Sequence, residues 1–185
     1  SLEGGMITTR DEGVYHRSRL LRNQGMERQY ANELVGLNNR LTDVGAAVGR
    51  VQLTKLSGWT KQRQENAAFL NEGLAGVEGV VTPFVPEGYR HVYHQYTIRF
   101  EGASASERDE LQKALREQWQ VGSGVYYPIP NHRLDSLTKY APDLELPVTE
   151  KAARECLSLP VHPSLSQADL ERIVEAVAAV VKAGA

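Results

Sequence analysis

The spacing of apolar residues predicts several helices, two of them clearly amphipathic. One begins at residues 166–169, and another follows residues 106–109, whose Ser-Glu-Arg-Asp sequence resembles a capping box with Asp in place of the usual Glu. Apolar residues then recur three or four positions apart, which places them on one face of a helix. These residues are Leu170, Ile173, Val174, Val177, Ala178 and Val181 in the first helix, and Leu111, Ala114, Leu115 and Trp119 in the second.

A longer helical pattern extends from residue 42 to about residue 74, with Gly58 as a candidate bend. Thr42 or Asp43 can cap its first turn. The residues near helical spacing are Val44, Val48, Val51, Leu56, Trp59, Ala67, Leu70 and Leu74. The first turns are rich in small residues, namely Gly45, Ala46, Ala47 and Gly49. Such residues let another backbone approach closely, so we interpret these turns as a packing surface. The alternative interpretation is an ordinary helix whose preceding loop is polar only because it is solvated.

Alternation of apolar and polar residues predicts a strand over residues 91–100, with Tyr96, Ile98 and Phe100 on its buried face. The other expected strands are residues 6–9, 121–127 and 156–160, and the shorter helices are residues 11–23, 132–140 and 148–156. In the first short helix the candidate core positions are Val14, Leu20 and Leu21. Residues 24–41 read as a long polar connection without regular periodicity.

The order of elements after the long helix is strand, helix, strand, helices, strand, helix. This order favours a small α/β lobe in which helices cover a sheet. At the start of the chain, a glycine turn leads into the strand of residues 6–9 with no preceding element to pair with it. We interpret this start as the middle of a domain.

Composition narrows the function classes. The 185 residues are enough for one ordinary domain, and 41% hydrophobic against 24% charged residues is typical of a globular protein. A net charge of −2 disfavours nucleic acid and anionic membranes as partners. There is a single cysteine, Cys156, no zinc-like Cys/His spacing, and no run of about 18 apolar residues or signal peptide. We therefore expect a cytoplasmic protein without a metal site.

Three side chains surround a Pro-Ile-Pro-Asn sequence at the end of an expected strand: Tyr126, Tyr127 and His132. A rigid loop carrying phenols and an imidazole suits hydrogen bonding to a hydroxyl-rich ligand. The alternative is that both tyrosines pack against neighbours while His132 caps a helix. The basic residues Arg17, Arg19 and Arg22 are interpreted as a solvated helix face.

The sequence Gly36-Leu37-Asn38-Asn39-Arg40-Leu41, followed by an Ala/Gly-rich helix, resembles the Gly-Tyr-Asn-Tyr-Arg-Met segment of the DegT/StrS family of pyridoxal-phosphate-dependent sugar aminotransferases. Asn39 and Leu41 depart from the family's usual Tyr and Met. Further segments resemble the family in the same order and spacing: residues 3–9, 20–25, 91–96, 124–132 and 157–163.

The resemblance implies the C-terminal part of an aspartate-aminotransferase-like fold (fold type I). Residues 1–41 would be a remnant of the large cofactor-binding domain, residues 42–76 a long interdomain helix, and residues 77–185 a small α/β domain with a helix-covered, largely antiparallel sheet. It also implies a homodimer, because the family's counterpart of Asn38 reaches the phosphate of the cofactor in the partner subunit.

By the same resemblance, the substrate-binding residues would be Arg40, Tyr126, Tyr127 and His132, at the sugar-nucleotide end of a shared pocket. Tyr126 replaces the family's common His. The parent enzyme would transfer an amino group from an amino-acid donor, glutamate, to a keto-sugar nucleotide, in cell-envelope or secondary-metabolite sugar biosynthesis.

The family's Schiff-base lysine precedes the Glu-Gly-Gly segment and has no counterpart here. The lysines present, Lys55, Lys61, Lys113, Lys139, Lys151 and Lys182, all fall on polar positions of expected helices or their ends. We therefore assign no catalytic residue and expect an inactive chain that does not retain pyridoxal phosphate. The alternatives are a pyridoxal-phosphate-dependent sugar dehydratase of the same family, or a non-catalytic dimerising or regulatory fragment.

Overall fold

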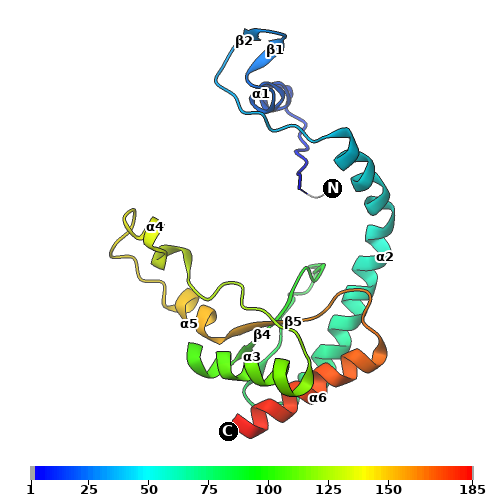
Figure 1. Ribbon diagram of the computed structural model, residues 1–185, viewed down its shortest axis with the longest axis vertical. Coiled ribbons are helices and arrows are strands. Elements are labelled where there is room, and N and C mark those ends of the chain that lie inside the picture. The colour runs from blue at the N-terminus through cyan, green and yellow to red at the C-terminus, as the bar shows by residue number, and fades with distance from the viewer. Residues whose placement is uncertain (1–2, 185) are drawn as a thin grey trace. The chain divides into compact units, whose positions relative to one another are not determined.

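A computed structural model describes residues 3–184, and these form two units that divide between Ser57 and Gly58 (Figure 1). One helix, α2 (Asp43–Leu74), contains the point of division. Each unit is described by itself below. Within residues 3–184, no helix combines the length and the apolar character needed to span a membrane.

The first unit contains α1 (Glu12–Arg22), the strands β1 (Met26–Arg28) and β2 (Ala31–Asn32), and the first half of α2. The Asp11 carboxylate caps α1 by accepting a hydrogen bond of 2.9 Å from the amide of Val14. The two strands pair as a small antiparallel hairpin, so the expected irregular connection over residues 24–41 was wrong for residues 26–32, whereas residues 33–41 form a loop as expected.

Two other expectations for this unit were also wrong. Residues 6–9 form no strand, since within residues 3–184 no strand pairs with them to supply hydrogen bonds. Of the expected core positions of α1, only Leu20 is buried, whereas Val14 and Leu21 are exposed. A single short helix beside a two-stranded hairpin has too few neighbours to cover more than one row of side chains.

The long helix α2 confirms the expected continuous helix, which passes through Gly58 without a break. The hydroxyl of Thr42 accepts a hydrogen bond of 3.1 Å from the amide of Gly45 at its start. The expected core positions divide along its length. The exposed ones are Val44, Val48, Val51 and Leu56, and the buried ones are Ala67, Leu70 and Leu74.

The second unit is built on a three-stranded antiparallel sheet in the order β3 (Val80–Val81), β4 (Tyr96–Phe100), β5 (Cys156–Leu159). The central strand β4 alternates as expected, with Tyr96, Ile98 and Phe100 buried. Residues 91–95, however, form a loop, so the strand is half as long as expected.

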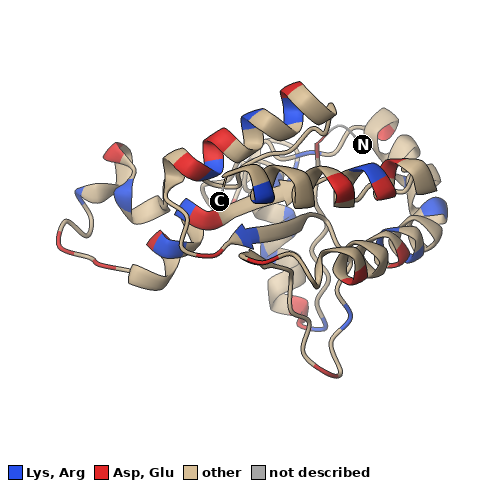
Figure 2. Ribbon diagram, turned by 90° about the horizontal axis from the view of Figure 1, so that it is seen from below, with Lys and Arg blue, Asp and Glu red and all other residues tan. Residues whose placement is uncertain are grey.

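The two amphipathic helices of this unit, α3 (Ala105–Trp119) and α6 (Gln167–Gly184), lie side by side and pack with the second half of α2 around the core (Figure 1). Acidic and basic residues are interspersed along their solvent-facing turns (Figure 2). The expected α/β class with a helix-covered antiparallel sheet is confirmed.

The cap of α3 differs from the expected one. Ser104 is the N-cap, its hydroxyl accepts from the amide of Glu107, and the Glu107 carboxylate accepts from the amide of Ser104. Glu107 is therefore the acidic residue of the capping box, the position that was expected for Asp109. Its longer side chain reaches back one full turn, which the shorter Asp side chain does less well.

The remaining elements are the 3-10 helix η1 (Asn131–Arg133) and the helices α4 (Asp135–Thr138) and α5 (Pro147–Glu155). They replace the single helix expected over residues 132–140 and confirm the one expected near residue 148. The strand expected over residues 121–127 was wrong. Instead an isolated bridge joins Gly124 to Ser158 of β5, and the two residues exchange backbone hydrogen bonds of 3.0 and 2.7 Å.

Candidate functional site

The loop of residues 34–41 is fixed against the C-terminal end of α1 by backbone hydrogen bonds. The amide of Leu37 donates to the carbonyl of Leu21 at 2.7 Å, and the amide of Gln24 donates to the carbonyl of Leu37 at 2.8 Å. The amide of Asn39 donates to the carbonyl of Arg22 at 2.9 Å. Two of these bonds are accepted by the carbonyls of Leu21 and Arg22, which have no partner within the last turn of α1.

Two glycines make this close approach feasible. A Cβ atom on Gly36 would collide with the backbone nitrogen of Gly25 and come within 2.9 Å of the carbonyl oxygen of Leu21. Gly25 itself has φ of +76°, a conformation that favours glycine, and a Cβ there would collide with the carbonyl of Leu34. The glycines therefore hold the loop in one register against α1.

Asn38 and Arg40 are exposed on this fixed loop. Asn38 forms a β-bridge with Asn23, which sets its backbone direction. The guanidinium of Arg40 lies 3.4 Å from the side-chain oxygen of Gln24, a long hydrogen bond that leaves most of its N–H donors free.

A cavity of about 490 Å³ opens beside Arg40, within the first unit. It is lined by Tyr15, His16, Arg19, Leu20, Arg22, Asn23, Met26, Glu27, Arg40 and Leu41. Three guanidinium groups therefore face a space that contains a single carboxylate, from Glu27. Such a charge balance favours an anionic ligand.

Arg19 and Arg22 were expected to be part of a solvated helix face, without a connection to Arg40. A usable signal was present, since Tyr15, Arg19 and Arg22 are spaced at i, i+4 and i+7 and so share one face of α1. What the sequence did not reveal is that the loop of residues 34–41 returns to that same face.

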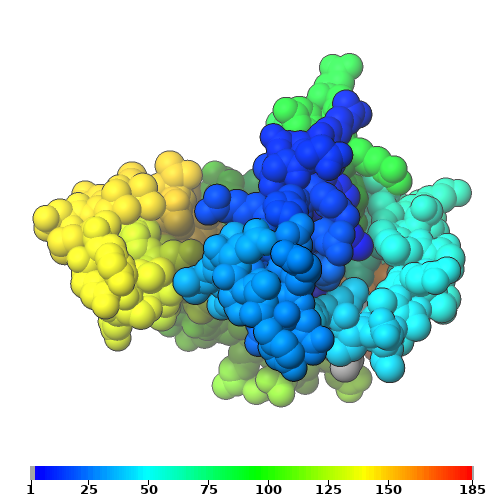
Figure 3. All heavy atoms as spheres, turned by 90° about the horizontal axis from the view of Figure 1, so that it is seen from above, coloured from blue at the N-terminus to red at the C-terminus, as the bar shows by residue number. Residues whose placement is uncertain are grey.

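The other expected substrate-binding residues belong to the second unit. Tyr126 and Tyr127 are exposed, and their rings meet edge to face with centroids 5.9 Å apart. The loop around α4 that follows them lies at the surface of this unit (yellow in Figure 3). Both phenols are accessible to a ligand, so the alternative that they are packed away against neighbours is not favoured.

His132 is held in a different way, because its side chain is only 5% exposed. Its Nε2 atom lies 2.8 Å from Oε1 of Glu150, and the guanidinium of Arg133 donates to the same oxygen at 2.8 Å. These hydrogen bonds, first that of His132 and then that of Arg133, lower the pKa of the Glu150 carboxyl from 4.5 to about 2. His132 thus ties η1 to α5 and offers little surface to a ligand.

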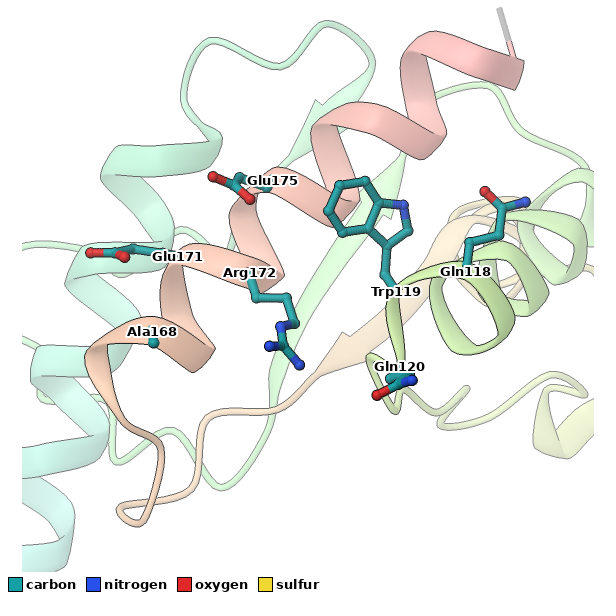
Figure 4. A pocket seen from close by; sticks show the side chains of 7 residues that line it. All are labelled: Gln118, Trp119, Gln120, Ala168, Glu171, Arg172 and Glu175. Atoms are coloured by element: carbon teal, nitrogen blue, oxygen red, sulfur yellow. The ribbon is translucent and has the colours of Figure 1, made fainter.

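A second cavity, of about 480 Å³, lies between the C-terminal end of α3 and α6 (Figure 4). The ring of Trp119 stands at one side, and Arg172 extends toward the open space while Glu171 and Glu175 lie along α6. One arginine against two carboxylates favours no single ligand charge. No sequence-predicted site residue lines this cavity.

All six lysines of the chain have exposed side chains on helices or at a helix end. None of them lines either of the two cavities. A lysine that forms a covalent bond to a cofactor is instead activated by desolvation or by a neighbouring charge in an enclosed site.

Comparison with known proteins matches residues 1–178 to the DegT/DnrJ/EryC1/StrS aminotransferase family. A pleiotropic regulatory protein of Geobacillus stearothermophilus is 39% identical over 95% of this chain and 46% of its own length. The dTDP-3-amino-3,4,6-trideoxy-alpha-D-glucose transaminase of Streptomyces venezuelae is 35% identical over 95% of this chain and 45% of its own. The chain spans about half the length of the curated relatives it matches.

Comparison with solved structures gives the same result as the sequence comparison. The crystal structure of S. venezuelae DesV in complex with a ketimine intermediate superimposes with a TM-score of 0.85 at 34% identity, over 93% of this chain and 45% of that one. The structure of ntda from Bacillus subtilis with bound cofactor PMP gives a TM-score of 0.84 at 26% identity, over 94% of this chain and 41% of that one. The fold, the segments that resemble the family in the same order along the chain, and the family match all support one assignment. The chain belongs to the DegT/DnrJ/EryC1/StrS aminotransferase family.

Proposed function

We propose that this chain is the C-terminal part of a pyridoxal-phosphate-dependent aminotransferase that acts on keto-sugar nucleotides. Within it, residues 1–41 belong to the large cofactor-binding domain, residues 42–76 link the domains, and residues 77–185 form the small domain. The observation that best supports the proposal is the loop of residues 34–41, which is pinned to α1 and presents Asn38 and Arg40 beside a basic cavity.

In this proposal Asn38 contacts the cofactor phosphate of a partner subunit, and Arg40 contacts the substrate. Tyr126 and Tyr127 donate hydrogen bonds to hydroxyl groups at the sugar-nucleotide end. His132 acts on the substrate only through the loop that it anchors, because Glu150 occupies its Nε2 atom.

The residues present fit one part of the cofactor. A cavity with three arginines suits a phosphate group, whereas six exposed lysines provide no enclosed amine for the aldehyde. When bound in the parent enzyme, pyridoxal phosphate supplies the electron sink for amino-group transfer. We therefore propose that this chain alone does not transaminate and does not retain the cofactor covalently.

The test uses the genomic DNA upstream of the Glu3 codon. We expect an in-frame segment there with a Ser/Thr-Lys sequence before Glu-Gly-Gly, and we expect the extended chain to aminate a keto-sugar nucleotide with glutamate as donor while the 185-residue chain does not. A His in place of that lysine would favour the sugar dehydratase. An upstream segment with neither residue would contradict the proposal.

We also propose that the parent is a homodimer and that the first half of α2 contributes to the interface. Val44, Val48 and Val51 are spaced at i, i+4 and i+7, and each is about half exposed or more, at 76%, 49% and 56%. Small residues in the same turns allow close approach of a second backbone. Light scattering of the chain and of its Val48→Glu variant tests this point. We expect the variant to be monomeric at concentrations where the unchanged chain is dimeric.

The regulatory alternative has one observation in its favour, because the relative with 39% identity is described as a pleiotropic regulatory protein. On that view the extended chain would bind a partner and lack transaminase activity. The amination assay above separates the two, since activity of the extended chain excludes a purely non-catalytic role.

A further inference from the structure

The basic cavity of the first unit contains more positive charge than the loop residues Asn38 and Arg40 account for. Arg19 and Arg22 line it from α1, and Arg40 lines it from the loop of residues 34–41. These side chains come from segments about twenty residues apart in the sequence. The backbone hydrogen bonds of the loop to α1 bring them together.

Within residues 3–184, none of these three arginines forms an ion pair with a carboxylate. Glu27 is the single acidic residue in the lining, so the cavity carries two more positive charges than negative ones, with His16 counted as neutral. Like charges gathered around one space repel each other unless a counter-charge lies between them.

Two of the three guanidinium groups, those of Arg19 and Arg40, are partly oriented before any ligand arrives. Arg19 donates to the phenol oxygen of Tyr15 at 3.0 Å and lies over the Tyr15 ring at 5.6 Å from its centroid. Arg40 donates to Gln24. Each contact uses one or two of the five N–H donors of a guanidinium, so the planar fork that matches phosphate oxygens stays available.

We propose that Arg19, Arg22 and Arg40 together bind the phosphate or diphosphate group of an anionic ligand within this chain. The inference rests on the proposed function for what the remainder of that ligand is, a cofactor or a sugar nucleotide. Binding of the phosphate itself requires only the cavity, and so it can succeed or fail independently of transamination.

The experiment is a calorimetric titration of the full 185-residue chain with inorganic phosphate and, separately, inorganic diphosphate, each at matched ionic strength with chloride as the balancing anion. The test variants are Arg19→Gln and Arg22→Gln, which remove a charge and keep the side-chain length. The matched control is Arg17→Gln, because Arg17 is on the same helix and does not line the cavity.

We expect each test variant to weaken binding about tenfold, as removal of a charge-assisted hydrogen bond does, and the control to change it less than twofold. Arg19→Lys keeps the charge but loses the paired N–H donors of the guanidinium. Its affinity for the anion should lie between that of the test variants and that of the control. A preference for diphosphate over phosphate assigns the site to the sugar nucleotide, and equal affinity assigns it to a single phosphate such as that of the cofactor.

The result that overturns the proposal is absence of saturable binding of either anion, or equal weakening by Arg17→Gln and by the two test variants. Circular dichroism of each variant establishes that α1 is intact. The lysine adduct experiment described at the end of the Discussion involves none of these arginines, so failure of the anion site is distinguishable from failure of the proposed function.

Discussion

At the scale of single residues, the position of Arg40 depends on a glycine rather than on another polar group. A side chain on Gly36 would meet backbone atoms of Gln24 and Gly25, which cannot move aside as a flexible side chain would. We expect Gly36→Ala to destabilise the loop by about 2 kcal/mol. The amide of Leu37 reports this change, because its hydrogen bond to Leu21 holds the loop and its hydrogen exchange should accelerate.

Gly58→Ala is the matched control. Gly58 is exposed within α2, and a Cβ there meets nothing within 4 Å. An Ala in a helix interior is favoured over Gly by about 1 kcal/mol, so this variant should be neutral or stabilising. Equal exchange at Leu37 in the unchanged chain and the Gly36→Ala variant would contradict the close approach.

The Glu150 carboxylate gives a prediction for pH. Its folded-state pKa of about 2 lies below the usual 4.5, so its ionised form stabilises the folded state above about pH 4.5. That contribution is lost as the pH falls from 4.5 toward 2. We expect amides of η1 and α4, such as that of Thr138, to lose protection over this interval.

In Glu150→Gln the protection of these amides should be lower at neutral pH and nearly independent of pH between 4.5 and 2. Glu145→Gln serves as control, since Glu145 is exposed and forms no ion pair with any residue of the range 3–184. An unchanged acid profile in Glu150→Gln would show that another carboxyl governs the segment.

At the scale of elements, α3 is joined to the rest of the second unit by a buried arginine. Arg108 is 1% exposed, and its guanidinium donates to the carbonyl of Ala153 at 2.9 Å and to the Asp109 carboxylate at 2.7 Å. Arg108→Met nearly keeps the volume but leaves the buried carbonyl of Ala153 without this donor, whereas the exposed Asp109 carboxylate can bind water. We expect a loss of about 3 kcal/mol in the free energy of unfolding, measured with denaturant.

Arg116→Met is the corresponding control, because Arg116 is exposed on the same helix. It should change the free energy of unfolding by no more than about 0.5 kcal/mol. A similar small change in Arg108→Met would mean that the Ala153 carbonyl is satisfied without it.

The helices were the most predictable elements, for a physical reason. The stripe of α6 and the long pattern of α2 are local properties, and their helical period is visible in the sequence itself. Strands depend on partners. Residues 6–9 and 121–127 have strand-like composition but lack a neighbour to pair with over their length, whereas β3 is too short to give a pattern at all.

Burial was less predictable than secondary structure. The charge of Arg108 is typical of a surface residue, but Arg108 is buried. The spacing of Val48 predicts a core residue, but Val48 is exposed. The site shows the same limit. The loop that carries Asn38 and Arg40 was recognised from its sequence, but its return to the face of α1 that bears Arg19 depends on contacts distant in the sequence.

At the scale of the whole molecule, we propose that the amine that captures the cofactor's aldehyde belongs to a part of the parent enzyme other than these 185 residues. Every lysine of the chain is exposed, so none lies in the kind of enclosed site in which a lysine usually forms a covalent bond to a cofactor.

The most direct measurement is to incubate the purified chain with pyridoxal phosphate, reduce it with borohydride, and map modified lysines by mass spectrometry. We predict sparse modification distributed over Lys55, Lys61, Lys113, Lys139, Lys151 and Lys182, rising in proportion to the reagent and removed by dialysis before reduction. A stoichiometric adduct on one of these lysines that survives dialysis would contradict the account.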